Sequence, residues 1–232
     1  MLIEEAQWFA RQIQMLDGRS IFPMLNVGSS TEKFRTVDQH FIDECIFKPA
    51  RDRNYAVIHM DIEPGQGVDI VGDLCNPAIF DELSTRGFNS IFCSNILEHV
   101  VDRQQICQTL QSILPFGGYI FVSCPYRYPF HPDPIDTMFR PDIDELYRLF
   151  PETSIIEGEI IRGKTLLGYH SHDPAIIFKT VLRIFTPFYK PWNWLKVLGH
   201  SPWLFRHCYQ TCLVLRKCRE RSFSTNAPKQ AT

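Results

Sequence analysis

Short apolar runs alternate with helical patterns along most of this 232-residue chain, and this alternation constrains its fold more than any other feature. The alternation predicts repeated strand–helix–strand units and therefore a mostly parallel sheet. Several runs are apolar along their whole length, as in strands that helices cover on both faces. We predict seven strands, in the ranges 23–27, 56–61, 68–71, 88–93, 119–124, 154–161 and 209–216. A chain of this length is typical of one α/β domain, which we assign to residues 1–218.

The clearest helical pattern lies between the fourth and fifth predicted strands. Apolar residues recur at helical spacing from Ile96 to Leu114, with polar residues between them. Pro115 and the pair Gly117-Gly118 follow, and they predict the end of this helix and a turn into the next strand. The first 16 residues have an amphipathic helical pattern and lack the basic and apolar regions of a signal peptide.

Charge and cysteine content exclude some classes of protein. The chain has 24 basic and 26 acidic residues and a formal net charge of -2, so its charge indicates neither a nucleic-acid partner nor an acidic one. The eight cysteines form no Cys-x-x-Cys pair, and several lie in apolar runs, so we interpret them as reduced core thiols. Because no run approaches the roughly 18 apolar residues of a membrane span, we expect a cytoplasmic protein.

Small and polar residues follow the first predicted strand. Asn26 and Val27 lead into Gly28-Ser29-Ser30, where small side chains let backbone amides approach a ligand at the carboxyl edge of a sheet. A glycine followed by two serines is also typical of an ordinary turn. The segment is therefore either part of a binding site or a simple turn.

Acidic residues follow the second and third predicted strands. Asp61, with Ile62 after it, is placed to accept hydrogen bonds from both hydroxyls of a ribose, although a helix cap or a solvated turn is the alternative. After the third strand, Asp73 offers an acceptor for an exocyclic amine and Leu74 an apolar surface for a purine. These two residues also suit an ordinary turn.

The fourth predicted strand leads into Ser94 and Asn95 and then into Leu97-Glu98-His99. Asn95 and Glu98 have the spacing of a capping box, in which Glu98 satisfies the first amides of the following helix. His99 is a candidate base because its ordinary pKa lies near neutrality, and its alternative is a partly buried imidazole with a structural hydrogen bond.

Together these segments resemble the class I S-adenosylmethionine (SAM)-dependent methyltransferases, in particular the methyltransferase type 11-like group with Leu-Glu-His after the fourth strand. The resemblance covers residues 24–151 and includes the run from Leu114 to Tyr119 before the fifth strand. It implies a Rossmann-like three-layer sandwich with an antiparallel last strand. It also implies that the turn after the first strand wraps the methionine part of SAM, that Asp61 holds the ribose, and that Asp73 and Leu74 contact the adenine. The residues that we expect to contact SAM are Asn26, Gly28, Ser29, Ser30, Asp61, Ile62, Asp73, Leu74, Ser94 and Asn95.

Two features depart from the pattern of this family. Asn26 and a Gly-Ser-Ser turn stand where the family has an acid and a fuller Gly-x-Gly-x-Gly pattern, and Gly28 lies 33 positions before Asp61 instead of about 20. Pyrophosphate binding depends on the full glycine pattern, whereas SAM carries no phosphate. The turn is therefore better suited to SAM than to a nicotinamide dinucleotide.

A proline-rich segment, residues 125–141, follows the fifth strand at the edge where open α/β sheets bind ligands. We predict the acceptor site here, with His131, His99 and Asp133 as candidate catalytic residues. His131 is the first candidate for the base that takes a proton from an acceptor hydroxyl. In the alternative interpretation, Asp133 or Asp136 pairs with Arg140 and only holds the loop shut.

Residues 169–207 form an aromatic and basic insertion before the last strand, with a helical pattern over 174–189. Such a segment suits a lid over the substrate cleft, a homodimer surface, or a peripheral membrane contact through residues 174–206. The polar tail, residues 219–232, is predicted to be disordered.

These features predict methyl transfer from SAM to a small polar acceptor, such as a hydroxyl of a sugar or another metabolite, without a metal ion. The lack of a basic patch and of an Asn-Pro-Pro-Tyr motif argues against a nucleic-acid substrate. Two alternatives stay open: a catalytically inactive scaffold protein with the SAM-binding fold, and a nicotinamide-dependent oxidoreductase, which the reduced glycine pattern disfavours.

Overall fold

The computed structural model describes residues 1–131, 135–169 and 201–218. A seven-stranded sheet with the order β3-β2-β1-β4-β5-β7-β6 lies at its centre. The strands are Met24–Val27 (β1), Val57–Asp61 (β2), Ile70–Val71 (β3), Ser90–Ser94 (β4), Tyr119–Arg127 (β5), Thr153–Thr165 (β6) and His207–Lys217 (β7). Strands β1 to β5 are parallel, and β7 runs antiparallel to both β5 and β6. The predicted mostly parallel sheet with an antiparallel last strand is confirmed.

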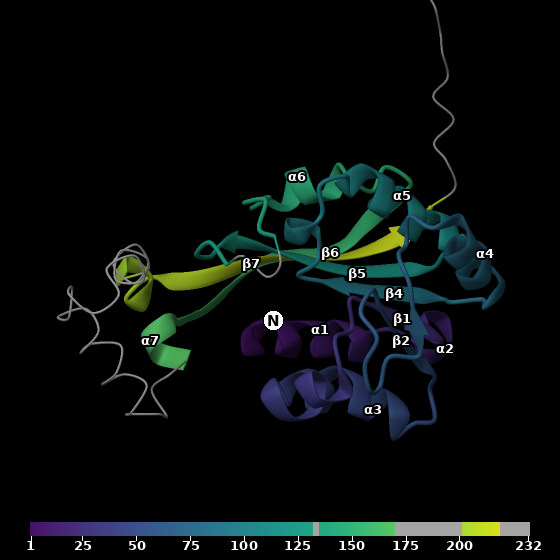
Figure 1. Cartoon of the computed structure of the whole chain (residues 1–232), viewed down its shortest axis with the longest axis horizontal. Helices are drawn as coiled ribbons and strands as arrows, with labels where there is room; N and C mark the ends of the chain where they lie inside the picture. The colour runs from purple at the N-terminus through teal and green to yellow at the C-terminus, as the bar shows by residue number, and fades with distance from the viewer. Residues whose placement is uncertain (132–134, 170–200, 219–232) are drawn as a thin grey trace, which may run out of the picture.

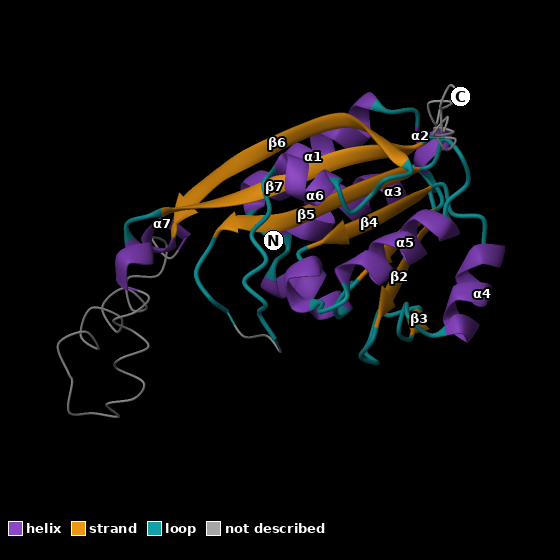
Figure 2. Cartoon of the chain, turned by 90° about the horizontal axis from the view of Figure 1, so that it is seen from above, coloured by secondary structure: helices purple, strands orange, loops and turns teal. Residues whose placement is uncertain are grey.

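Helices cover both faces of this sheet, which gives the predicted three layers (Figure 1). One face carries Ile3–Met15 (α1), Gly18–Ile21 (α2) and Lys48–Arg51 (α3), and the other carries Pro77–Thr85 (α4), Arg103–Ile113 (α5) and Ile143–Tyr147 (α6). Viewed from above, β6 and β7 extend beyond the other strands toward Leu166–Tyr169 (α7) (Figure 2). The shorter helical turns are Phe34–Asp38 (η1), Asp43–Phe47 (η2), Leu97–His99 (η3) and Ser201–Leu204 (η4).

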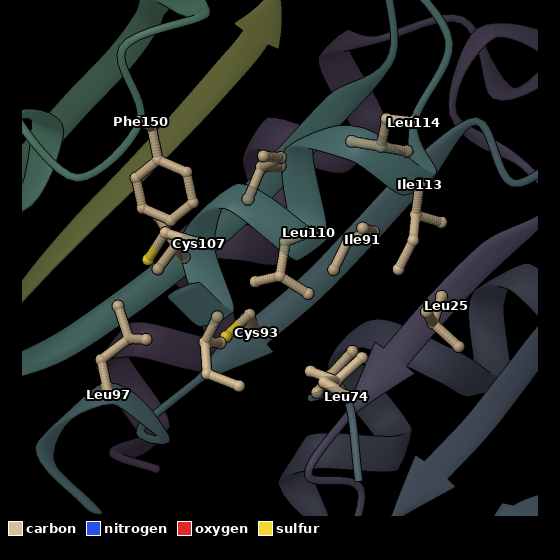
Figure 3. Packing of buried hydrophobic residues seen from close by; sticks show 14 of the residues in the cluster. Leu25, Leu74, Ile91, Cys93, Leu97, Cys107, Leu110, Ile113, Leu114 and Phe150 are labelled. Carbon is tan, nitrogen blue, oxygen red and sulfur yellow. The ribbon is translucent and has the colours of Figure 1, made fainter. Parts of the chain in front are cut away.

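Each face of the sheet has its own apolar core. On the α1 side, the ring of Phe9 packs edge-on against Phe92 of β4, with ring centroids 5.0 Å apart. On the other side, Cys107 and Leu110 of α5 lie among side chains from β1, β4 and β5 (Figure 3). Burial of apolar area at roughly 25 cal/mol per Å² is the main stabilising contribution of both layers.

All eight cysteines are free thiols. Cys93, Cys107, Cys124, Cys208 and Cys212 are buried, as expected of core thiols. Cys75 is exposed, so the interpretation does not extend to every cysteine.

The helix predicted from Ile96 to Leu114 is wrong at its start. Residues 97–99 form the separate turn η3, and α5 begins only at Arg103. Asp102 is the residue that caps α5, because its side chain accepts a hydrogen bond from the Gln105 amide at 3.0 Å. Apolar residues such as Ile96 and Val100 still pack against the core, which is why the spacing suggested a continuous helix.

Candidate functional site

A cavity lined by described residues opens at the carboxyl edge of the parallel strands. It has a volume of about 590 Å³ and is lined by residues from the ends of β1, β2 and β4 and from the segment after β5. The chain runs from β1 outward to β3 and then returns to β4 on the other side of β1. Ligands of open α/β sheets bind at such a reversal of strand order.

The turn after β1 forms one wall of the cavity. Gly28 has φ +61°, and a Cβ atom there would lie 2.6 Å from Cδ1 of Ile96, so the position requires glycine for both its backbone conformation and its close packing. Ser29 is buried and Ser30 also has a positive φ, +52°. Asn26 contributes an amide whose Nδ2 lies 3.0 Å from Nδ1 of His59. All four predicted turn residues line the cavity.

Arg35 holds this turn in place. Its guanidinium is buried and donates hydrogen bonds to the carbonyls of Ser29 (3.0 Å), Ser30 (2.6 Å) and Gly67 (2.7 Å). Arg35 was not predicted as a site residue, because a single arginine in a polar stretch carries no distinguishing pattern.

Asp61 lies at the rim of the same cavity as Gly28. Its Oδ2 accepts a hydrogen bond from the Ser30 amide at 2.7 Å, and its Oδ1 accepts one from the Glu63 amide at 3.1 Å. The carboxylate therefore joins the ends of β1 and β2 and keeps further acceptor capacity, because two oxygens accept about four hydrogen bonds in total. Ile62, which is 64% exposed, also lines the cavity.

Asp73 and Leu74 lie away from the cavity lining. Leu74 is only 6% exposed and belongs to the apolar core, and Asp73 accepts a hydrogen bond from the Cys75 amide at 2.8 Å. Both residues have contacts that suit an ordinary turn, and their contact with adenine stays a prediction.

The carboxylate of Glu5 in α1 is buried beneath the cavity, and it was not predicted as part of the site. Its Oε1 accepts hydrogen bonds from the Ser94 hydroxyl (2.9 Å), the Asn95 amide (3.0 Å) and the Ser123 hydroxyl (2.5 Å), and its Oε2 accepts one from the Leu2 amide (3.0 Å). Ser94 and Asn95 both line the cavity, as predicted. Glu5 therefore fixes the end of β4, where Asn95 has φ +54°.

The predicted capping box between Asn95 and Glu98 is wrong. The Asn95 side chain donates a hydrogen bond to Glu5, and Glu98 is fully buried, with no hydrogen-bond partner among the described residues for either carboxylate oxygen. Burial raises the pKa of Glu98 to about 8. Glu98 lines the cavity, and so does His99.

His131 and His99 lie together where the segment after β5 lines the cavity, with ring centroids 5.3 Å apart. Nδ1 of His131 lies 3.2 Å from the Pro129 carbonyl and 3.2 Å from Oδ2 of Asp136. Burial lowers the pKa of His131 and outweighs the opposite effects of Pro129 and Asp136. The imidazole is therefore neutral at pH 7.

Asp136 and Arg140 form the loop ion pair that the sequence analysis offered as its alternative. Nη2 of Arg140 lies 2.6 Å from Oδ2 of Asp136. Burial alone would raise the pKa of Asp136, but hydrogen bonds from Arg140 and from the His131 and Met138 amides lower it to about 2. The carboxylate thus stays charged and fixes the loop that carries His131.

Several predictions concern residues outside the described parts of the chain. They are Asp133 as a catalytic residue, most of the insertion 169–207, and the tail 219–232. Within the described ranges, no helix is both long and apolar enough to cross a membrane.

The sequence matches no protein-family model and no curated protein. The structure is similar to the [4+2]-cyclase SpnF, with a TM-score of 0.55 and 14% identity over 94% of this chain and 81% of that one. A protein from Galdieria sulphuraria assigned as a sarcosine dimethylglycine methyltransferase gives a TM-score of 0.55 and 12% identity over 93% and 85% of the two chains. A protein from Bacillus halodurans C-125 assigned as a methyltransferase gives 0.52 and 12% identity over 91% and 98%. At these identities the likeness concerns the fold.

Proposed function

We propose that this chain, whose fold is that of the class I SAM-dependent methyltransferases, binds SAM at the carboxyl edge of β1, β2 and β4 and transfers its methyl group to a small polar acceptor. The acceptor group in this proposal is a hydroxyl. A nucleic-acid substrate has no support in the near-neutral charge of the chain.

The observation that carries the proposal is that Gly28 and Asp61 border one cavity at the reversal of strand order. Its volume of about 590 Å³ lies within the range of about 300–1,000 Å³ that small-molecule sites have. The Asp61 carboxylate retains acceptor capacity for the two hydroxyls of a ribose after its two backbone hydrogen bonds. The residues at this edge therefore fit an adenosyl group.

The other end of the cavity is suited to an acceptor. SAM supplies an electrophilic methyl group on a sulfonium, so the protein has to align the acceptor, exclude water and remove a proton. Tyr128 and Pro125 line this end, and the ring of Tyr128 packs edge-on against His131. Nδ1 of His131 faces the Pro129 carbonyl, which leaves Nε2 to accept the proton of an acceptor hydroxyl.

Calorimetric titration of the full-length protein with SAM tests cofactor binding directly. We expect one binding site for SAM and no binding of a nicotinamide dinucleotide under the same conditions. Absence of heat with SAM would overturn the proposal and favour the scaffold alternative.

Replacing Asp61 with asparagine should weaken SAM binding about 10- to 100-fold, because hydrogen bonds to a charged acceptor contribute about 1.5–3 kcal/mol. Asparagine has nearly the same shape, so the turn around Ser30 is disturbed as little as possible. The matched control is Asp17→Asn, since Asp17 also accepts a hydrogen bond from a backbone amide, that of Arg19, but caps α2 and does not line the cavity. Its affinity for SAM should stay within about twofold of the wild type. Equal affinities for all three proteins would refute the role of Asp61.

The acceptor itself can be identified by incubating cell extract with the protein and methyl-labelled SAM, followed by mass spectrometry. A labelled small metabolite that requires intact His131 would support the proposed acceptor class. Label found only in protein or nucleic acid would contradict it.

A further inference from the structure

Three metal-ligating side chains come together at the acceptor end of the cavity. Among the described residues, one potential ligand atom from each of Glu98, His99 and His131 lies within 4.8 Å of the other two. Oε1 of Glu98 and Nε2 of His99 are 3.7 Å apart. Two ligands of a tetrahedral ion with bonds of about 2.1 Å are about 3.4 Å apart, so this pair needs little movement to share an ion.

In both imidazoles Nδ1 faces a backbone carbonyl, and the described residues give Nε2 no hydrogen bond. Nδ1 of His99 contacts the carbonyl of Ile135, and Nδ1 of His131 lies 3.2 Å from the carbonyl of Pro129. A carbonyl oxygen only accepts hydrogen bonds, so in the neutral form of each ring Nδ1 carries the proton and Nε2 keeps its lone pair. Metal-binding histidines have this arrangement, in which the second ring nitrogen donates to a carbonyl or carboxylate and orients the ring. Asp136, 3.2 Å from Nδ1 of His131, adds a carboxylate to that outer layer.

Glu98 supplies an independent observation. Its side chain is 0% exposed, and within the part of the chain that the structure describes neither carboxylate oxygen has a hydrogen-bond partner. A buried acidic group without a partner is costly, because it loses its hydration and gains nothing in exchange. A cation between Glu98 and the two imidazoles would satisfy both oxygens, whereas a purely structural role leaves them unsatisfied.

We propose that Glu98, His99 and His131 bind a divalent transition-metal ion. Two imidazole nitrogens and one carboxylate are the ligands of catalytic zinc sites and of open iron sites, whereas Mg²⁺ and Ca²⁺ prefer oxygen ligands throughout. All three residues line the cavity, so the remaining coordination position would face the space of the acceptor. The sequence spacing of these ligands does not resemble that of cysteine-based zinc sites, because two of them are adjacent and the third lies 32 residues later.

The role of the ion rests on the proposed methyl transfer, although its binding does not. A hydroxyl coordinated to the ion loses its proton to water at a lower pH than a free hydroxyl, so the acceptor oxygen becomes a better nucleophile. In the metal-loaded protein, His131 would then serve as a ligand, and the ion would replace it in activating the acceptor.

Titration of the chelator-treated full-length protein with Zn²⁺, in competition with a chromophoric chelator, tests the site. We expect one equivalent to bind and the thermal unfolding midpoint to rise with Zn²⁺. His99→Gln, His131→Gln and Glu98→Gln should each weaken this binding at least about 100-fold and abolish the rise. The control is His40→Gln, because His40 is exposed but also lies near a glutamate, Glu44, at 4.0 Å. His40→Gln should bind Zn²⁺ as the wild type does.

The result that would overturn the inference is wild-type affinity in the folded His99→Gln and His131→Gln variants, or less than one equivalent bound by the wild type. If Glu98→Gln does not fold, the two histidine variants still decide the question. SAM titration of the same samples separates this inference from the proposed function: Zn²⁺ binding without SAM binding would support the metal site and refute the methyltransferase proposal. SAM binding without Zn²⁺ binding would refute the metal site alone.

Discussion

His131→Gln should lower methyl-transfer turnover at least about 100-fold, while the affinity for SAM changes less than about twofold. Glutamine removes the basic ring nitrogen but keeps a polar side chain of similar length. The measurement is single-turnover transfer of labelled methyl to the acceptor identified from extract, with calorimetry for SAM affinity. The control is His207→Gln, because His207 lies at the start of β7 and its Nδ1 contacts the Gly163 carbonyl. Unchanged turnover in His131→Gln would remove this residue from the reaction.

The pH dependence of the wild type provides a second measurement on His131. Burial lowers its pKa below the ordinary value of 6.5, so the imidazole is mostly neutral at pH 7 and above. Turnover should therefore be level from pH 8 to 7 and fall at lower pH, as the ring gains a proton. A fall that begins well above pH 7 would contradict the assignment. Removing metal with a chelator at constant pH then distinguishes a base from a ligand, because only a ligand requires the ion.

Glu5→Ala should lower the free energy of unfolding by about 3 kcal/mol or more. The substitution removes the carboxylate that four donors share as their acceptor. It leaves the Ser94, Asn95 and Ser123 side chains facing a buried cavity. Hydrogen bonds to a charged group contribute about 1.5–3 kcal/mol each, and an unsatisfied buried donor costs a similar amount. Urea unfolding with linear extrapolation measures the change.

The matched substitution is Glu44→Ala, because Glu44 is exposed in η2 and its carboxylate only lies near His40, at 4.0 Å. Its unfolding free energy should change by less than about 0.5 kcal/mol. A loss below about 1 kcal/mol in Glu5→Ala would mean that Glu5 does not hold the end of β4.

The sheet could be predicted from the sequence because each strand leaves a local signal. Apolar runs such as the one ending at Cys93 are buried on both faces, and the turn at Gly117-Gly118 separates α5 from β5. The full length of β6 and β7 could not be predicted, because these strands continue as an antiparallel pair through polar residues beyond Ile161. Hydrogen-bonded pairing between strands that are distant in the sequence maintains these strand ends. The pattern of apolar residues does not predict such pairing.

The candidate site could be predicted only in part, for the same physical reason. Gly28 and Asp61 follow strands directly, so the topology alone brings them to one edge. The side chains that donate hydrogen bonds to Glu5 lie 89 to 118 positions away, and no local pattern indicates such contacts. For Glu98 a local pattern is present but misleading. Its spacing from Asn95 fits a helix cap, whereas its side chain is buried in the protein.

The register of the last two strands bears on how freely the segment between them can vary in length. Thr165 of β6 pairs with His207 of β7, so the chain leaves the sheet and returns to it at neighbouring positions. The two ends of the segment that connects these strands therefore lie at paired positions, and the entropic cost of closing a flexible loop grows by only about 0.6 kcal/mol for each doubling of its length. A change in the length of this segment should therefore cost little stability, and it leaves the edge that carries Gly28 and Asp61 in place.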